Sequence, residues 1–163
     1  IVCLHSPLCK LSGVMPFSRA TSAGYLINDL ARRFAAALQT RIKPMGLSTG
    51  VFPIMVQLWE EDGLTQADLV RRIGIEQATM ANTLTRMQRD GLIDRRPSQA
   101  DGRAHEVRLT EKGRKLQVPA IEAALAVNAS ALSGLSSDER SQFLNLLSKT
   151  IDTFDAAAET ARS

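Results

Sequence analysis

A change of hydrophobic period in the middle third of the chain constrains its fold more than any other feature of the sequence. Thr65-Gln66-Ala67-Asp68 has the form of a capping box, with Asp where Glu or Gln is usual, and predicts a short helix over about 66–72. Gly74 then turns the chain. A second helix is expected from about Glu76 to Asp90, with an inner stripe of Met80, Leu84 and Met87. Two helices joined by a tight turn predict a helix-turn-helix.

Directly after the second helix, the pattern becomes typical of a β-hairpin. Gly91 suits a left-handed cap at the end of the helix. Residues 92–97 and 104–109 are then expected to form two short strands. Asp101-Gly102 lies between them in a segment rich in turn formers, which is a strong hairpin signal. A hairpin placed behind a helix-turn-helix makes a wing, so the sequence predicts a winged helix.

The segments on either side are expected to be helices with long apolar stripes. One covers about 21–43, and another follows Ser48 or Thr49 to about Glu61, where Pro53 is tolerated only if the helix begins late. A fifth helix is expected over 111–133 with a bend at Pro119, and a sixth from the capping box at Ser136–Glu139 to about Ala158. The fold class is therefore mainly α with a small β-hairpin wing.

Composition limits the classes of protein that fit. The 163 residues, 44% hydrophobic and 23% charged, suit one globular domain, expected over 21–160 behind a loosely ordered tail at 1–20. No window resembles a membrane span. Cys3 and Cys9 cannot form a disulfide framework, and the two histidines are far apart, so neither metal nor cofactor is expected. No nucleophile–base pair or phosphate-binding glycine loop supports an enzyme.

Positive charge is concentrated in the predicted winged helix. Residues 64–115 hold eleven Lys and Arg against seven Asp and Glu, a net of +4, whereas the remainder holds nine against ten, a net of −1. An excess of this kind is expected of a nucleic-acid-binding module. A solvated surface with extra arginine is the alternative, and charge alone does not decide between the two.

The outward face of the second helix of the pair carries side chains that can distinguish base edges. Gln and Asn suit adenine, and Arg suits guanine or phosphate. The residues on this face are Gln77, Thr79, Asn82 and Arg86. On an isolated helix they would be ordinary solvated residues. The adjoining wing and charge excess favour the interpretation that this helix reads the major groove of DNA.

Further candidates lie around that helix. Thr65 and Gln66 begin the preceding helix and are placed for a phosphate, although Thr65 also serves as its cap. Arg72, Arg95 and Arg96 are candidate phosphate clamps, and each is as well explained as a plain surface residue. The wing turn holds Asp101, Gly102 and Arg103, and Arg103 is placed to enter the minor groove.

Three stretches carry a family resemblance: LTQADLVRRIGIEQAT, LTRMQRDGLIDRR, and DGR followed by VRLTEKG. They resemble the winged-helix core of the MarR/SlyA transcriptional regulators. The match is strong over Leu64–Gly113, and the number and order of the flanking helices extend it to most of residues 21–160. Gly102 departs from the pattern, because many members carry Arg there, so the wing has one fewer cation. Either Arg103 enters the minor groove, or it pairs with Asp101 and the wing contributes less.

The resemblance implies an obligate homodimer on a near-palindromic operator. Helices within 21–46 and 111–160 would dimerise, and 47–110 would form the DNA-binding lobe. The implied interface residues are Leu26, Leu30, Leu125, Leu132, Phe143, Leu147, Ile151 and Phe154. Alternatively, these side chains pack against one another within one chain. The family acts mostly as cytoplasmic bacterial repressors, and many members release DNA when a small phenolic or aromatic carboxylate binds. Phe52, Met55 and Trp59 could line such an effector pocket or belong to the core.

Two other functions remain open from the sequence. The winged helix could be a protein-interaction module, although such a module would more often carry an apolar patch in place of the polar face. A thiol-based regulator that senses oxidants through Cys9 is the other alternative. The cysteine sensors of the family carry their cysteine in the first helix, and Cys9 precedes the first helix expected here.

Overall fold

The structure, a computed structural model, describes residues 17–97 and 105–160. It consists of helices and a small three-stranded sheet, as the fold class predicted. The N-terminal elements are α1 (Ala23–Ile42), a 3₁₀ turn η2 (Lys43–Met45) and α2 (Phe52–Glu60). The middle elements are β1 (Leu64–Thr65), α3 (Gln66–Ile73), α4 (Gln77–Arg89), β2 (Ile93–Pro97) and β3 (His105–Leu109). The C-terminal elements are α5 (Glu111–Lys115), α6 (Gln117–Ala131) and α7 (Ser137–Thr160).

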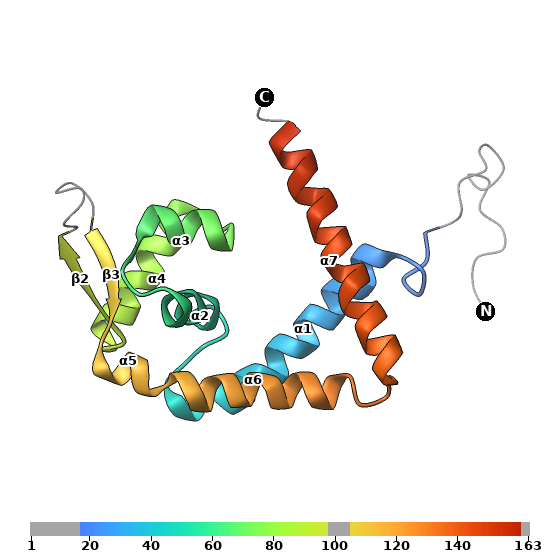
Figure 1. Cartoon of the computed structure of the whole chain (residues 1–163), viewed down its shortest axis with the longest axis horizontal. Helices are drawn as coiled ribbons and strands as arrows, with labels where there is room; N and C mark the ends of the chain where they lie inside the picture. Colours follow the sequence, from blue (N-terminus) through green and yellow to red (C-terminus); the bar gives the residue numbers. More distant parts are fainter. Residues whose placement is uncertain (1–16, 98–104, 161–163) are drawn as a thin grey trace.

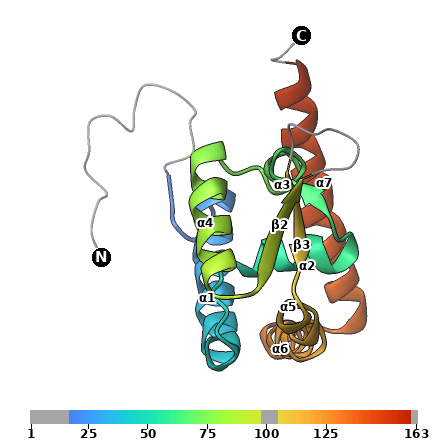
Figure 2. The same ribbon diagram turned by 90° about the vertical axis from the view of Figure 1, so that its left-hand side faces the viewer.

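The elements from α2 to β3, here called the lobe (residues 52–109), lie at one end of the molecule (Figure 1). The helix α6 runs away from the lobe, and α1 packs along it. The helix α7 leaves the far end of α6 and rises away from it (Figure 1). Seen from the lobe end, α4 and the β2–β3 hairpin stand side by side at the front of the molecule (Figure 2). No helix in the described ranges is both long and apolar enough to cross a membrane.

The sheet is antiparallel, with β3 between β1 and β2. Leu64 pairs with Val107 across β1 and β3, and Ile93 pairs with Leu109 across β2 and β3. The sequence pattern predicted β2 and β3 but missed β1. A strand of two residues shows no alternation that a pattern could reveal, and Thr65 already serves as the cap of α3.

The core lies inside the lobe and continues into the first half of α6. Ala120 and Ala123 of α6 are buried in the same cluster as the side chains of the lobe. A fully buried stripe on α4 faces this cluster, as its helical spacing predicted. The small residues of α6 allow the helix to approach the lobe closely. The fully buried large side chains of the core are Ile42, Ile54, Met55, Leu58, Leu69, Met80, Leu84, Met87, Ile93 and Val107.

Two prolines lie in the first turns of their helices, and only Pro119 differs from expectation. The second helix begins at Phe52, later than Ser48 or Thr49, so Pro53 lies in its first turn, where no backbone hydrogen bond is lost. The helix expected over 111–133 is two helices, α5 and α6, which meet at Leu116. Pro119 therefore lies in the first turn of α6 and does not bend a continuous helix. Its ring and missing N–H prevent helical pairing with the carbonyl of Lys115, which explains the break one turn earlier.

Candidate nucleic-acid interface

The helix α3 begins at a reciprocal capping box, as predicted. The Thr65 Oγ1 accepts a hydrogen bond from the backbone N–H of Asp68 at 3.2 Å. The carboxylate of Asp68 accepts hydrogen bonds from the Thr65 hydroxyl at 2.6 Å and the Thr65 backbone N–H at 3.1 Å. Arg71 pairs with the same carboxylate at 2.5 Å. The sharp start of α3 is thus fixed by local contacts, and Gly74, with φ of 74°, ends the helix.

The capping box has a consequence for the pH dependence of stability. The hydrogen bonds from Thr65, assisted by Arg71, hold the pKa of Asp68 below its ordinary value. A depressed pKa in the folded state stabilises the fold above the ordinary pKa, and this contribution is lost as the pH falls through the folded value. We expect Asp68→Asn to lower the free energy of unfolding by about 1 kcal/mol at neutral pH. The difference should shrink toward zero as the pH approaches 2.

Urea titrations between pH 2 and 7 measure this effect. Asp94→Asn, at an exposed position on β2, removes the same charge without touching a cap and is the control. A difference between wild type and Asp68→Asn that stays constant with pH would contradict the role given to the carboxylate.

The helix α4 separates an apolar face from a polar one. The buried side includes Met80, Leu84 and Met87, whereas the residues predicted to read bases, Gln77, Thr79, Asn82 and Arg86, are all exposed. An open groove of about 560 Å³ runs over this face, lined by Thr79, Asn82, Thr85 and Arg86. The helix thus presents donors and acceptors on a surface anchored by the core.

Arg86 is oriented by its own helix. Its Nη2 donates to the hydroxyl of Thr83 at 3.2 Å, and that hydroxyl donates to the carbonyl of Thr79 at 2.8 Å. Thr83 is buried although it is polar. This contact restricts the guanidinium while leaving most of its donors free for a partner.

A pair of glutamines that the sequence did not reveal joins the starts of the two helices. The amide Nε2 of Gln66 donates to Oε1 of Gln77 at 3.0 Å. Both residues were predicted as separate contacts, and the structure brings them together. They border a groove of about 620 Å³ between α3, α4 and the hairpin, whose polar lining residues are Thr65, Gln66, Gln77, Gln88, Arg95 and His105.

The three predicted phosphate clamps have different surroundings. Arg72 pairs with Glu61, and Arg95 lies half-buried against α4, with Nη2 3.4 Å from the carbonyl of Ala81. The Nε of Arg95 is buried without a partner among the described residues. Arg96 is exposed on β2. Arg72 and Arg96 are thus both accessible to a phosphate, although Arg72 would have to leave Glu61. Asp101, Gly102 and Arg103 lie outside the described residues, as does Cys9.

One further basic surface was missed. A groove of about 350 Å³ lies where η2 and the start of α2 meet the end of α4. Lys43, Arg86 and Arg89 border it. The i,i+3 spacing of Arg86 and Arg89 was a signal for two cations on one side of α4, but nothing in the sequence placed Lys43 beside them.

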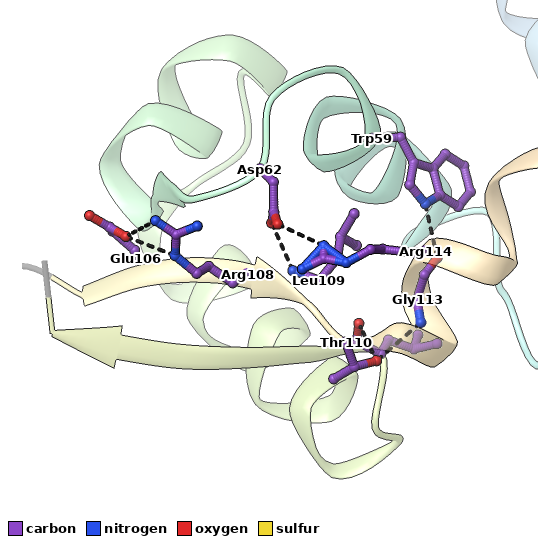
Figure 3. A network of polar contacts seen from close by, with 9 residues as sticks. Trp59, Asp62, Glu106, Arg108, Leu109, Thr110, Gly113 and Arg114 are labelled. Atoms are coloured by element: carbon purple, nitrogen blue, oxygen red, sulfur yellow. Dashed lines mark hydrogen bonds and ion pairs between the residues drawn. The ribbon is translucent and has the colours of Figure 1, made fainter.

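The residues considered for an effector pocket are packed together. Met55 is fully buried in the core. The rings of Phe52 and Trp59 meet edge to face, with centroids 6.2 Å apart and an interplanar angle of 75°. The indole Nε1 of Trp59 donates to the carbonyl of Gly113 at 3.0 Å (Figure 3). In this structure all three side chains are occupied by packing, so their role in binding an effector stays a prediction.

The residues predicted to form a dimer interface are open to solvent in the single chain. Leu26, Leu125, Ile151 and Phe154 are exposed, Phe154 to 72%. Leu30, Leu132, Phe143 and Leu147 are half-buried. None of the side chains described in α7 is buried. Within the described residues, this helix of 24 residues leaves large apolar side chains exposed, which is typical of an interaction surface.

The order of α3, a tight turn, α4 and a β2–β3 hairpin defines a winged helix-turn-helix protein. Residues 47–105 match the model of the MarR family. Solved structures of MarR-type regulators share the fold of this chain over most of their own length. Residues 47–105 are therefore a MarR-type winged-helix domain, and the fold of the surrounding helices is similar to that of MarR-type regulators.

Three of these structures are representative. A MarR transcriptional regulator from Methanosarcina mazei Go1 is 27% identical, with a TM-score of 0.77, and the match covers 82% of this chain and 96% of that one. BpsR from Bordetella bronchiseptica, whose DNA binding is regulated by 6-hydroxynicotinic acid, is also 27% identical, with a TM-score of 0.77 and coverage of 85% and 99%. PcaV from Streptomyces coelicolor, solved in complex with its natural ligand, is 25% identical, with a TM-score of 0.75 and coverage of 85% and 98%.

Proposed function

We propose that this protein is a bacterial, cytoplasmic transcriptional repressor that binds double-stranded DNA as a homodimer and releases it when a small aromatic acid binds. The observation that carries the DNA-binding part is the exposed polar face of α4. Its side chains suit base edges, and it is held rigidly by a buried apolar stripe. Cations border it on the sides of β2 and of η2. An apolar patch, which a protein-interaction module would favour, is absent from this face in the described part of α4.

Homodimerisation is supported by the unpartnered apolar side chains of the helical end. They lie on α1, α6 and α7, away from the lobe (Figure 1). A two-fold assembly would cover them and would present two copies of α4 to half-sites about one helical turn of DNA apart. One interface would then both cover the apolar side chains and place the two α4 helices as a palindromic operator requires.

The proposed site can be tested at Arg86. We expect Arg86→Ala to weaken binding to a selected duplex by about 1–3 kcal/mol, because the guanidinium faces the groove and is oriented for contact. The duplex is obtained by selection from a random library with the wild-type protein. Affinity is then measured by fluorescence anisotropy over a range of salt concentrations, and we expect binding to fall steeply with salt.

Lys149→Ala is the matched control for Arg86→Ala. It removes one exposed positive charge from α7, outside the lobe. Equal affinities of Arg86→Ala and the wild type would remove Arg86 from the interface. A wild-type protein that enriches no duplex would contradict the proposed function and favour an interaction module.

The effector part of the proposal is supported by the ligand-responsive regulators of similar fold and by a preformed cavity. A cavity of about 310 Å³ lies between α1 and α6, a volume that suits a single-ring compound. Its walls are mostly apolar, from Leu30, Phe34, Ala37 and Val127. Arg33, whose Nε pairs with Asp29 at 2.7 Å, also borders the cavity and would have to contact a carboxylate through its other N–H groups. Loss of the DNA complex on titration with benzoate and hydroxybenzoates, reversed by dialysis, would support this part of the proposal.

A further inference from the structure

The contacts of Asp62 with Leu109 and Arg114, here called the lock, join the lobe to the helices that extend from it. Asp62 follows α2 and is half-buried. Its Oδ1 accepts a hydrogen bond from the backbone N–H of Leu109 at 2.8 Å, and its Oδ2 accepts one from Nη1 of Arg114 at 2.9 Å. One carboxylate thus contacts the end of β3 and the short helix α5 at once (Figure 3). These two contacts bridge 47 and 52 positions of sequence.

A second contact from the same segment strengthens the lock. Trp59, in the last turn of α2, donates to the carbonyl of Gly113 in α5. Residues 59–62 therefore hold residues 109–114 at three points from one side (Figure 3). On the other side, the Thr110 hydroxyl donates to the carbonyl of Gly91 at 2.7 Å. The helix α5 is fixed between two parts of the lobe.

The lock lies at α5, the short helix that connects the lobe to α6. This helix has five residues and ends at Leu116, where the chain breaks before entering α6. The side chains that would dimerise lie on α1, α6 and α7, and those that would read DNA lie on α4. Two segments connect the lobe to the helical end, α5 and the residues 43–51 between α1 and α2. A rotation of the lobe against α6 would therefore change α5, residues 43–51 and the packing of Ala120 and Ala123.

We propose that Asp62 is a positioning residue, which fixes the angle between the lobe and α6 and thereby the half-site spacing that the dimer accepts. This inference rests on the proposed function. One base pair changes the separation of two half-sites by about 3.4 Å and also rotates one relative to the other. A dimer with two rigidly held lobes accepts one separation, whereas a dimer with loosened lobes tolerates several. The lock would therefore act on specificity more than on overall affinity.

The test uses duplexes with two copies of the half-site selected by the wild-type protein, separated by the selected spacing or by one or two base pairs more or fewer. Asp62→Asn keeps an acceptor for the N–H of Leu109 but removes the charge opposite Arg114. Arg114→Gln removes the charge on the other side of the pair. Lys115→Gln is the matched control, because Lys115 is the neighbouring cation and, among the described residues, pairs within α5, with Glu111 at 2.6 Å.

We expect the wild type and Lys115→Gln to prefer one spacing by about tenfold. Asp62→Asn and Arg114→Gln should bind that spacing about fivefold more weakly and bind the others unchanged, which flattens the profile. Arg114→Lys, which keeps the charge, should retain the wild-type profile. Circular dichroism of each variant checks that the fold is intact. A general loss of stability would lower binding to all spacings equally and would leave the preference unchanged.

Two outcomes separate the inference from the proposed function. If the wild type selects no duplex, the proposed function fails and the inference fails with it. If the wild type selects a duplex but Asp62→Asn and Arg114→Gln retain its sharp preference, or Lys115→Gln flattens it equally, the inference alone is overturned.

Discussion

Gly113→Ala is expected to destabilise the protein by about 3 kcal/mol, a large part of the stability of a domain of this size. Gly113 is buried, and a Cβ atom there would clash with the backbone carbonyl oxygen of Leu92 and lie 3.2 Å from Cδ2 of Leu109. Because the first of these atoms belongs to the backbone, no side-chain rotation relieves the clash. The cap of α5 would also suffer, since Thr110 Oγ1 accepts from the N–H of Gly113 at 3.0 Å.

Gly24→Ala is the matched control. An added Cβ at Gly24 meets nothing within 4 Å, and Ala is the better helix former, so this variant should be stabilised by about 0.5–1 kcal/mol. Urea unfolding of both variants at one protein concentration measures the difference, because the stability of a dimer depends on concentration. Equal midpoints for Gly113→Ala and wild type would mean that α5 can move away from Leu92 at little cost.

If the protein forms the proposed homodimer, replacing Ile151 and Phe154 together by Asp is expected to convert it into monomers at micromolar concentration. Both side chains are exposed in the single chain and belong to the apolar stripe of α7. Burial of a large apolar side chain contributes about 2 kcal/mol, and two-fold symmetry brings four such side chains into the interface, about 8 kcal/mol in all. Like charges that face one another would add to the loss. Sedimentation velocity measures the result.

The control places the same charges on the other side of the helix. Asn145 and Ala156 are exposed and lie on the opposite face of α7 from Ile151 and Phe154, given 100° per residue. We expect Asn145→Asp with Ala156→Asp to sediment like the wild type. A dimer that survives the Ile151 and Phe154 exchange would place the interface elsewhere.

The elements that the sequence predicted well are those encoded by neighbouring residues. The capping box at Thr65 and Asp68 involves residues three apart, and its hydrogen bonds form as expected. The stripe of Met80, Leu84 and Met87 fixed which side of α4 faces the core, and this also fixed which side remains for a partner. The helical periodicity of α1 and the second capping box at Ser136 and Glu139 are of the same kind.

Features that depend on distant residues could not be predicted in this way. The Asp62–Arg114 pair joins two segments whose proximity depends on the whole lobe. Arg72 and Arg95 looked like free cations because a sequence does not show that Glu61 and the carbonyl of Ala81 lie within reach. Pro119 interrupts the helix at Leu116, about one turn before the proline. The sequence had suggested a bend at the proline itself.

The helix α7 has a consequence for how the protein matures. Its apolar side chains stay exposed among the described residues, so in the proposed homodimer their burial would depend on an encounter between two newly made molecules. Such an encounter is second order, and its half-time grows as the copy number per cell falls. A regulator made in few copies would therefore spend longer with this stripe exposed, where chaperones and proteases act. The number of functional molecules would then rise more steeply than the rate of synthesis.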